Sequence, residues 1–407
     1  MTSGHHQGRA GRSIPGVASL TLFGTLLTVT AISHAQAPAS RVRARDLGIT
    51  IGTLTPGPLN AITDVGGVIV GHSTVVRGDG PLRIGDGPVR TGVTAVLPRK
   101  DIWFNAVFGA THTLNGDGEM TGIHWIRDLE TIAHPILITN TASVGSVHEG
   151  AMAYMNERHP GRDWGFLPIV AETWDGRLND IRGLHVKRQH VFEALDAASG
   201  GPVAEGNVGG GTGMIAYQFK GGIGTSSRRL TKAEGLYTVG VLVQANFGSR
   251  DQLIIDGVPV GRELAKELLP GVKNANQPEP EGSVIVVIAT DAPLSSRQLE
   301  RVARRAALGL ARTGTSSGNT SGDIFLAFST ANVIPQQKTP AVLDVKLLST
   351  DEINPIFRAT VEATEEAVIN AMMKAETMTG INGNVVYALP YDRLGVVMAK
   401  YGRPLRR

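Results

Sequence analysis

Residues 284–290 are the feature of this sequence that most restricts its fold. They are almost all β-branched or small and apolar, and they follow a polar segment interrupted by two prolines. Such a run is typical of a buried strand, whereas a proline-broken segment can neither continue a helix nor form a central strand. The chain therefore passes from an exposed connection, residues 270–282, into a sheet at the Gly282–Ser283 bond.

Ser283 has a hydroxyl next to the Gly282 carbonyl at this junction. If the hydroxyl attacks that carbonyl and the bond breaks, Ser283 becomes an N-terminus with its amine beside its own Oγ. A terminal amine has a pKa of about 8, so near neutral pH it can act as the base for the hydroxyl. Ser283 could also simply begin a strand, which is the commoner role for a serine.

A second strand, residues 323–329, is separated from the first by a helical segment. Strands joined by one helix are expected to be parallel neighbours, so their N-terminal ends lie side by side. Residues two apart on a strand share a face, so Ser321 and Asp323 are predicted to face Ser283 together. The Ser321 hydroxyl, oriented by Asp323, would then hold the nucleophile Ser283. The alternative is that Ser321 is only a turn residue and that Asp323 only caps the start of the strand.

The rest of the sequence alternates short apolar runs with helical patterns. Predicted strands cover residues 65–70, 92–97, 102–108, 136–139, 167–170, 214–219, 237–243 and 253–255. Predicted helices cover residues 144–157, 186–198, 261–268, 295–314 and 354–377. This order predicts an α/β sandwich of sheets and helices.

The N-terminus has the pattern of an export signal. Arg9 and Arg12 precede a mostly apolar stretch, residues 17–32, and Ala35-Gln36-Ala37 supplies a small-residue cleavage site. Polar residues interrupt the apolar stretch, which makes it a poor permanent membrane span. We predict removal of residues 1–37 and a periplasmic or secreted mature protein.

Charge and cysteine content exclude several other classes. The net charge is +3, and the basic residues are spread along the chain, which argues against nucleic acid as a partner. No cysteine is present, so packing alone must hold an exported core. No segment of the mature chain is long and apolar enough for a transmembrane helix, and we predict no membrane association.

Four motifs resemble known sites but lack part of each pattern. Residues 314–318 match G-x-S-x-G but follow a helix, whereas a nucleophile elbow follows a strand. His148 lacks the second histidine of a zinc-protease helix, and residues 207–213 lack the lysine of a phosphate loop. Residues 115–119 have too few oxygen ligands for calcium and are better interpreted as a hairpin turn. We therefore predict neither a metal nor an organic cofactor.

Six ordered segments together resemble a known family. They are residues 282–294, 321–332, 115–122, 139–145, 171–180 and 243–246. With these motifs, residues from about 50 to 400 resemble the DmpA/BapA family of self-processing serine aminopeptidases.

The resemblance implies a four-layer αββα sandwich, similar to N-terminal-nucleophile hydrolases but differently connected. It also implies self-cleavage between Gly282 and Ser283. Residues 38–282 would become the larger chain and residues 283–407 the smaller one, and the two would remain together as one domain. Several such heterodimers are expected to form a homo-oligomer.

The family also implies roles for particular side chains. Ser283 would be the nucleophile for self-cleavage and for substrate, with Ser321 and Asp323 orienting and activating it. Asn246 would donate its amide to the oxyanion. Glu172 would bind the free amino group of a small peptide or amino-acid amide.

Trp174 departs from the family pattern, which has tyrosine after Glu172-Thr173. Indole offers an N–H donor and no acceptor, so the substrate pocket is expected to differ. The sequence leaves open whether L-α-amino, D-amino or β-amino substrates are preferred. Two other functions also stay open at this point, an acyltransferase of the ornithine acetyltransferase type and a non-catalytic periplasmic binding protein.

Overall fold

Strand β11 (Gly282–Thr290) lies inside a six-stranded sheet, as its apolar sequence predicts. The strand order is β4-β3-β12-β11-β10-β9. The other strands are β3 (Asn105–Gly116), β4 (Thr131–Ile132), β9 (Gly222–Arg229), β10 (Thr238–Phe247) and β12 (Gly322–Pro335). β11 is parallel to β12 and antiparallel to β10. The predicted parallel pair is thus present.

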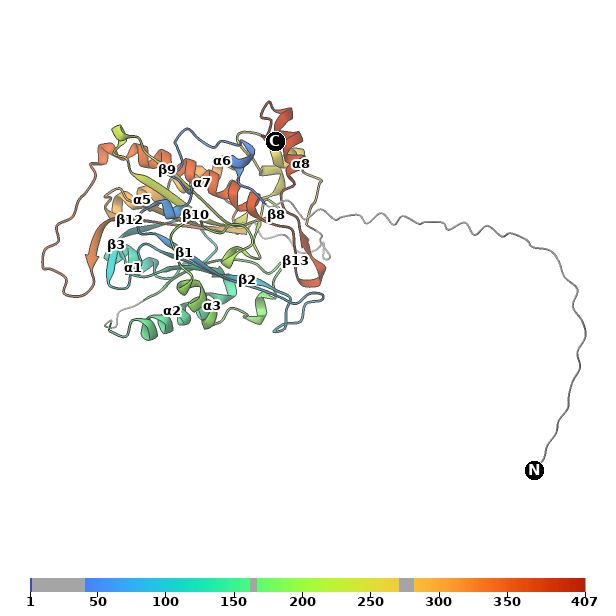
Figure 1. Cartoon of the computed structure of the whole chain (residues 1–407), viewed down its shortest axis with the longest axis horizontal. Coiled ribbons are helices and arrows are strands. Elements are labelled where there is room, and N and C mark those ends of the chain that lie inside the picture. The colour runs from blue at the N-terminus through green and yellow to red at the C-terminus, as the bar shows by residue number, and fades with distance from the viewer. Residues whose placement is uncertain (2–40, 162–166, 271–281, 407) are drawn as a thin grey trace, which may run out of the picture. The chain divides into compact units, whose positions relative to one another are not determined.

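The structure is a computed structural model that describes residues 1, 41–161, 167–270 and 282–406 (Figure 1). The predicted export signal and most of the connection before Gly282 lie outside these residues. Among the described residues, no helix is long and apolar enough to cross a membrane.

A second sheet packs against the first. Its strand order is β1-β2-β5-β6, and the strands are β1 (Ile69–Arg77), β2 (Val89–Leu97), β5 (Ile136–Asn140) and β6 (Ile169–Thr173). Ile285 and Leu326 from the first sheet share one apolar core with Val96 and Ile138 from the second. The two sheets therefore form the two inner layers of the fold.

Helices cover the outer face of each sheet (Figure 1). α5 (Ser296–Ala303), α6 (Ala306–Arg312) and α7 (Asn354–Lys374) lie on the six-stranded sheet, and α2 (Val144–Arg158) and α3 (Arg188–Asp196) lie on the other. Val284 and Val286 of β11 face the α7 side, while Ile285 and Val287 face the second sheet. Burial on both faces explains why β11 is apolar throughout, and the layers are those of the predicted αββα sandwich.

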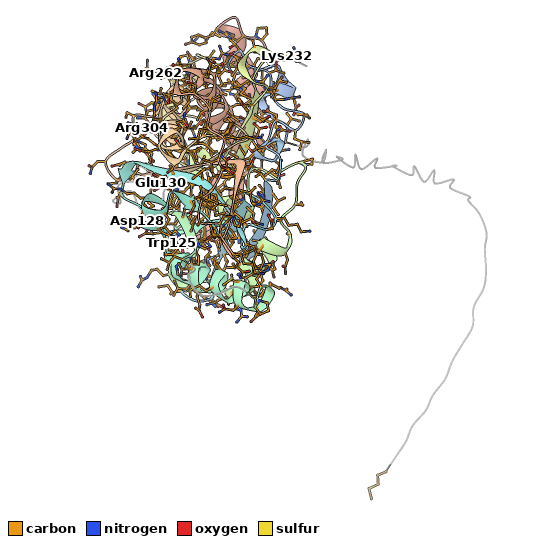
Figure 2. All side chains as sticks on the ribbon, turned by 90° about the vertical axis from the view of Figure 1, so that its left-hand side faces the viewer. Trp125, Asp128, Glu130, Lys232, Arg262 and Arg304 are labelled. Atoms are coloured by element: carbon orange, nitrogen blue, oxygen red, sulfur yellow. The ribbon has the colours of Figure 1, made fainter. Side chains whose placement is uncertain are left out.

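Shorter elements complete the fold. They are α1 (Ile123–Leu129), α4 (Val260–Glu263), α8 (Tyr391–Lys400), and the hairpins β7 (Ile215–Ala216) with β8 (Phe219–Lys220) and β13 (Met378–Thr379) with β14 (Val385–Val386). Lys232, Arg262 and Arg304 lie exposed on separate elements (Figure 2). This dispersion agrees with the scattered basic residues of the sequence.

Several predicted elements differ from the structure. The helix predicted for residues 295–314 is divided into α5 and α6. Residues 253–255 form no strand, only an isolated bridge between Ile255 and Val258. The helix predicted for residues 261–268 is reduced to α4. β9 and α8 were not predicted. β9 has a polar sequence because its side chains bond to other elements, as when Ser226 Oγ donates to the Ala363 carbonyl.

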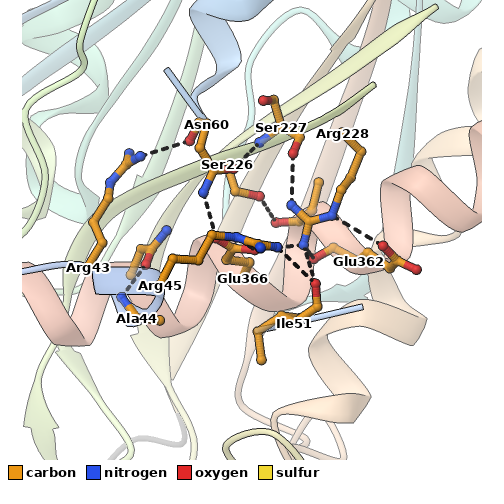
Figure 3. A network of polar contacts seen from close by, with 12 residues as sticks. Arg43, Ala44, Arg45, Ile51, Asn60, Ser226, Ser227, Arg228, Glu362 and Glu366 are labelled. Carbon is orange, nitrogen blue, oxygen red and sulfur yellow. Dashed lines mark hydrogen bonds and ion pairs between the residues drawn. The ribbon is translucent and has the colours of Figure 1, made fainter. Parts of the chain in front are cut away.

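A buried charge network joins β9 and α7 to the segment that follows residue 41 (Figure 3). The Arg228 guanidinium donates to Glu362 at 3.2 Å and to Glu366 at 2.7 Å. Arg45 forms a two-pronged pair with Glu366, and Asn60 Nδ2 donates to the same carboxylate at 2.6 Å. Each buried charge therefore has opposite charge and hydrogen bonds around it, which is the condition for burial without a large penalty.

Candidate active site

Ser283 is the second residue of β11, and its side chain is buried, with 6% of the residue exposed. Its Oγ accepts a hydrogen bond from the Gly322 backbone N–H at 3.1 Å. Gly322 begins β12, the parallel neighbour. The N-terminal ends of the two strands thus lie side by side, as the sequence predicts, and they hold the hydroxyl in one position.

Gly282, the residue before this serine, has a backbone that other residues adopt only with strain. Its φ is +79°, in the left-handed region. A Cβ at this position would lie 1.9 Å from the Asn246 carbonyl oxygen and 2.8 Å from Phe247 Cα. Glycine is therefore required here both by conformation and by space.

Asn246 lies directly opposite Ser283 across the antiparallel pair β10–β11. Paired residues on neighbouring antiparallel strands share a face, with Cβ atoms about 5 Å apart. Asn246 Oδ1 accepts from the Ile215 N–H at 2.8 Å, and Nδ2 donates to the Trp174 carbonyl at 2.9 Å. These two partners fix which end of the amide is oxygen and which is nitrogen. An amide nitrogen has two N–H bonds, so the second remains for a ligand.

Ser321 and Asp323 are hydrogen-bonded to each other at the start of β12. The Ser321 hydroxyl donates to Asp323 Oδ1 at 2.6 Å, and the Ser317 hydroxyl donates to Oδ2. Burial raises the pKa of Asp323, while the two hydroxyl donors oppose that rise. The pair therefore forms a buried polar cluster next to the Ser283 junction.

The contact with Ser283 differs from the predicted relay. In the parallel register Asp323 is level with Val284 rather than with Ser283. The described hydrogen bond to Ser283 Oγ comes from Gly322 N–H, between the two predicted residues. Sequence reasoning missed this donor because a backbone N–H leaves no signal in the residue type.

Glu172 lies on β6 and is almost completely buried, with 3% exposed. Its Oε1 accepts from the Glu119 N–H at 2.9 Å, and its Oε2 accepts from the Thr141 hydroxyl. Burial raises the pKa of Glu172, and these two donors partly oppose the rise. A buried carboxylate of this kind is stabilised when a cation binds beside it.

The turn at residues 115–119 connects Glu172 with the serine junction. Asn115 Nδ2 donates to the Gly318 carbonyl at 2.6 Å, which fixes the turn against the loop before β12. A Cβ on Gly118 would lie 3.0 Å from Gly322 Cα and 3.2 Å from Glu172 Oε1. Glu172 and Gly322, whose N–H holds Ser283 Oγ, therefore both lie next to the same methyl-sized position. The sequence had identified this segment as a turn and a family motif only.

Trp174 contributes its backbone to the site and exposes part of its indole. Its carbonyl receives the Asn246 amide, and 37% of the residue is exposed. The ring packs over Gly176, where a Cβ would lie 2.5 Å from the ring edge. The residue that departs from the family pattern is thus next to the candidate oxyanion donor.

The other motifs keep their structural interpretations. Residues 209–211 form a buried turn, in which Gly210 N–H donates to Thr94 Oγ1 at 3.1 Å. The G-x-S-x-G serine, Ser316, follows α6 and precedes β12, which is not the position of a nucleophile elbow. Within the described ranges, no group of three or more His, Asp or Glu residues could hold a metal ion.

The site combines three groups suited to acyl transfer. They are a positioned hydroxyl (Ser283), an amide N–H donor across the strands (Asn246) and a buried carboxylate (Glu172). A nucleophile and an oxyanion donor are the parts that an acyl-enzyme mechanism needs, and an acid at one side selects for a positive group on the substrate.

Comparisons with known proteins agree with this chemistry. The profile of peptidase family S58 matches residues 60–386. The chain is 49% identical over 386 residues to the beta-peptidyl aminopeptidase BapA of Sphingosinicella xenopeptidilytica. The matched region covers 92% of this chain and 95% of that protein.

Two solved structures are also similar. One is a beta-aminopeptidase from a Burkholderia species, with a TM-score of 0.81, 46% identity and coverage of 89% of this chain and 99% of that one. The other is the L-aminopeptidase D-Ala-esterase/amidase from Ochrobactrum anthropi, described as a prototype for the serine aminopeptidases and a variant of the Ntn hydrolase fold. It has a TM-score of 0.81, 45% identity and the same coverage.

Proposed function

We propose that Ser283 is the nucleophile of this protein and that the precursor cuts itself between Gly282 and Ser283. The premise is that this chain belongs to peptidase family S58 and is a serine aminopeptidase. The observation that carries the proposal is the position of Ser283 Oγ. It accepts the Gly322 N–H at 3.1 Å, beside the amide of Asn246 on the neighbouring strand.

In self-cleavage, Ser283 Oγ attacks the Gly282 carbonyl carbon. The bond from that carbon to the Ser283 nitrogen breaks, the acyl group moves to Oγ as an ester, and the nitrogen takes up the hydroxyl proton. Water then hydrolyses the ester and leaves a carboxylate on Gly282. Ser283 keeps its hydroxyl and gains a free amine.

In substrate turnover, that amine acts as the general base. It accepts the Oγ proton while Oγ attacks the first amide carbonyl of the substrate, and Asn246 donates its free N–H to the oxyanion. The proton passes to the leaving nitrogen as the amide bond breaks. Water hydrolyses the acyl-enzyme by the same route and releases the N-terminal residue.

Ser321 and Asp323 hold the segment that presents Gly322 N–H to the nucleophile. Their mutual hydrogen bond and the bond from Ser317 fix both carboxylate oxygens. They orient Ser283 through this segment and assist its activation. Trp174 borders the substrate, and its carbonyl keeps the Asn246 amide in place.

Glu172 binds the substrate's ammonium group. Each of its oxygens accepts one hydrogen bond from the protein and retains a lone pair for the ligand. This arrangement restricts hydrolysis to substrates with a free amino terminus. We further propose that the preferred substrates have an N-terminal β-amino acid, with L-α-amino amides and D-amino esters or amides as weaker ones. High identity to a beta-peptidyl aminopeptidase over nearly the whole chain supports this preference.

The processed enzyme is proposed to work outside the cytoplasm. The basic, apolar and small-residue order of residues 1–37 supports export to the periplasm or medium. The product is one domain made of residues 38–282 and 283–407, and several such heterodimers assemble into a homo-oligomer. Nucleic acid and membrane are not expected partners of the mature form.

The decisive experiment compares the wild-type chain with Ser283→Ala. Mass spectrometry of the wild type should find two chains, the smaller beginning at Ser283, and the variant should remain one folded, inactive chain. An active uncut wild type, or a cut Ser283→Ala chain, would overturn the proposal. A panel of p-nitroanilides with L-α, D-α and β-homoamino acids then ranks substrates. Transfer to added amines faster than hydrolysis would instead indicate an acyltransferase.

A further inference from the structure

Lys220 is a fully buried lysine beside the candidate site that has no role in the mechanism above. It lies at the end of β8, in register with Ile215 of β7. Its Nζ donates to three backbone carbonyls, those of Met214 at 2.8 Å, Gly221 at 2.9 Å and Gly211 at 3.3 Å. An ammonium group has three N–H donors, so these three acceptors match its charged form.

A buried ammonium is costly unless the protein replaces its water contacts. Burial lowers the pKa of Lys220 to about 7, and the nearby charge of Asp175 opposes this. The three carbonyls are the groups that compensate for lost hydration. The presence of a lysine at such an unfavourable position indicates that its hydrogen bonds have a function.

The peptide unit between Met214 and Ile215 links Lys220 to Asn246. Met214 C=O and Ile215 N–H belong to the same peptide unit. Lys220 Nζ donates to the oxygen of that peptide unit, and the N–H of the same unit donates to Asn246 Oδ1 at 2.8 Å. An unbroken series of hydrogen bonds therefore runs from the ammonium, through one peptide group, to the side-chain amide.

Hydrogen bonds in such a series polarise one another. A positive charge at the carbonyl oxygen withdraws electrons from the peptide and makes its N–H a stronger donor. That donor acts on Asn246 Oδ1 and in turn makes the Nδ2 hydrogens more positive. One of these hydrogens bonds to the Trp174 carbonyl, and the other is the one left for an oxyanion.

We propose that Lys220 is a positioning residue that orients and polarises the Asn246 amide through the Met214–Ile215 peptide. This inference rests on the proposed role of Asn246 as oxyanion donor. Lys220 touches neither substrate nor nucleophile in this scheme. Its effect should therefore be confined to the step in which negative charge develops, and substrate binding should not depend on it.

The test is a double-mutant cycle with Lys220→Met and Asn246→Ala, in which rates are expressed per cut chain as counted by intact mass. Loss of one oxyanion donor lowers kcat by about 100-fold or more, and loss of its polarising partner should lower it about 10- to 100-fold with KM little changed. Because both act on one donor, Lys220→Met should cause little further loss in an Asn246→Ala background.

A matched control and a graded variant separate this role from a merely structural one. The Thr212 hydroxyl donates to the Gly209 carbonyl at 2.6 Å in the same loop, outside the relay. Thr212→Val should leave kcat near the wild-type value. Lys220→Gln keeps two N–H donors, so its kcat should lie between those of the wild type and Lys220→Met. It also supplies the test if Lys220→Met does not fold.

The outcomes distinguish this inference from the proposed function. Two results would show that Lys220 does not act through Asn246. In the first, Asn246→Ala lowers kcat but the Lys220 variants do not. In the second, the fold-loss in kcat of the double mutant equals the product of the losses of the two single mutants. If Asn246→Ala itself leaves kcat unchanged in a processed enzyme, the oxyanion assignment on which the inference rests is wrong.

Discussion

Asn246 and Ser283 face each other across β10 and β11, and the Asn246 amide is held at both ends, by Ile215 N–H and by the Trp174 carbonyl. The proposed oxyanion donor is thus positioned before any substrate arrives. Preorganised donors stabilise a developing oxyanion without having to reorient during the reaction.

Asn246→Ala should therefore lower kcat by about 100-fold or more while KM changes little. Steady-state kinetics on processed enzyme measure both constants. Asn246→Asp keeps the acceptor for Ile215 N–H but has no N–H of its own when ionised. It should be as slow as the alanine variant, and an aspartate variant of near wild-type rate would contradict the assignment.

Gly282→Ala should prevent correct formation of the proposed cleavage junction. Alanine at φ +79° is strained, and its Cβ would meet the Asn246 carbonyl oxygen at 1.9 Å. We expect uncut chain on denaturing gels. Gly257 provides a control, because its φ is +77° but no atom lies within 4 Å of a Cβ there. Gly257→Ala should cost only about 1 kcal/mol of strain and be processed normally. Equal processing of both variants would exclude the steric explanation.

In the proposed mechanism Glu172 should add a second step to the acid side of the activity profile, below the step that protonation of the Ser283 amine, with its pKa of about 8, produces. Burial raises the pKa of its carboxyl group, and only the ionised form can pair with the substrate's ammonium group. kcat/KM should therefore fall as the pH drops through this raised pKa, at a higher pH than an exposed glutamate would produce.

The matching variant is Glu172→Gln, which keeps the shape but not the charge. A hydrogen bond to a charged group contributes about 1.5–3 kcal/mol, so kcat/KM should fall about 10- to 100-fold, mainly through KM. The acid limb due to Glu172 should disappear in this variant. An unchanged KM and an unchanged pH profile would place the amino group of the substrate elsewhere.

Glu366→Ala should destabilise the fold strongly. Its carboxylate accepts from Arg45, Arg228 and Asn60, and its removal leaves the buried Arg228 short of a partner. Breaking a buried pair in this way costs about 3–5 kcal/mol, which urea unfolding of the uncut Ser283→Ala chain can measure. Glu300 is exposed on α5, and Glu300→Ala should change the free energy of unfolding by less than about 0.5 kcal/mol.

The same carboxylate gives a pH dependence of defined sign. The charges of Arg228 and Arg45, with the hydrogen bonds, lower the pKa of Glu366 in spite of its burial. Its contribution to stability is therefore present above the pKa of an unfolded glutamate. It should be lost as the pH falls through the lowered folded-state pKa. In Glu366→Ala this part of the acid destabilisation should be absent.

The sequence predicted those parts of the fold that side-chain pattern determines. β11 and its parallel neighbour β12 could be found because their apolar runs are buried on both faces. Helix α7 was found from its spacing and from Pro355 near its start. β9 was missed because Thr225, Ser226 and Arg228 are buried there through hydrogen bonds to distant segments, and periodicity does not detect such partners.

The candidate site was predictable to a similar extent. Ser283 was identified from its position before a buried strand, and Asn246 and Glu172 from family motifs. The structure brings Ser283 and Asn246 together across a strand pair. The group that holds Ser283 Oγ could not be found in this way, because it is the backbone N–H of Gly322. Lys220 gave no signal either, since its partners are carbonyls that every residue has.

The charge network around Glu366 would be affected by the proposed cleavage of the chain. Arg45, Asn60 and Arg228 precede the Gly282–Ser283 bond, whereas Glu362 and Glu366 follow it. Before the cut, unfolding and refolding are unimolecular. After the proposed cut the same contacts would join two separate polypeptides, and the melting temperature should then rise with protein concentration. The proposed cut would thus turn a unimolecular folding equilibrium into a bimolecular one, in which diluting the unfolded chains disfavours their reassembly.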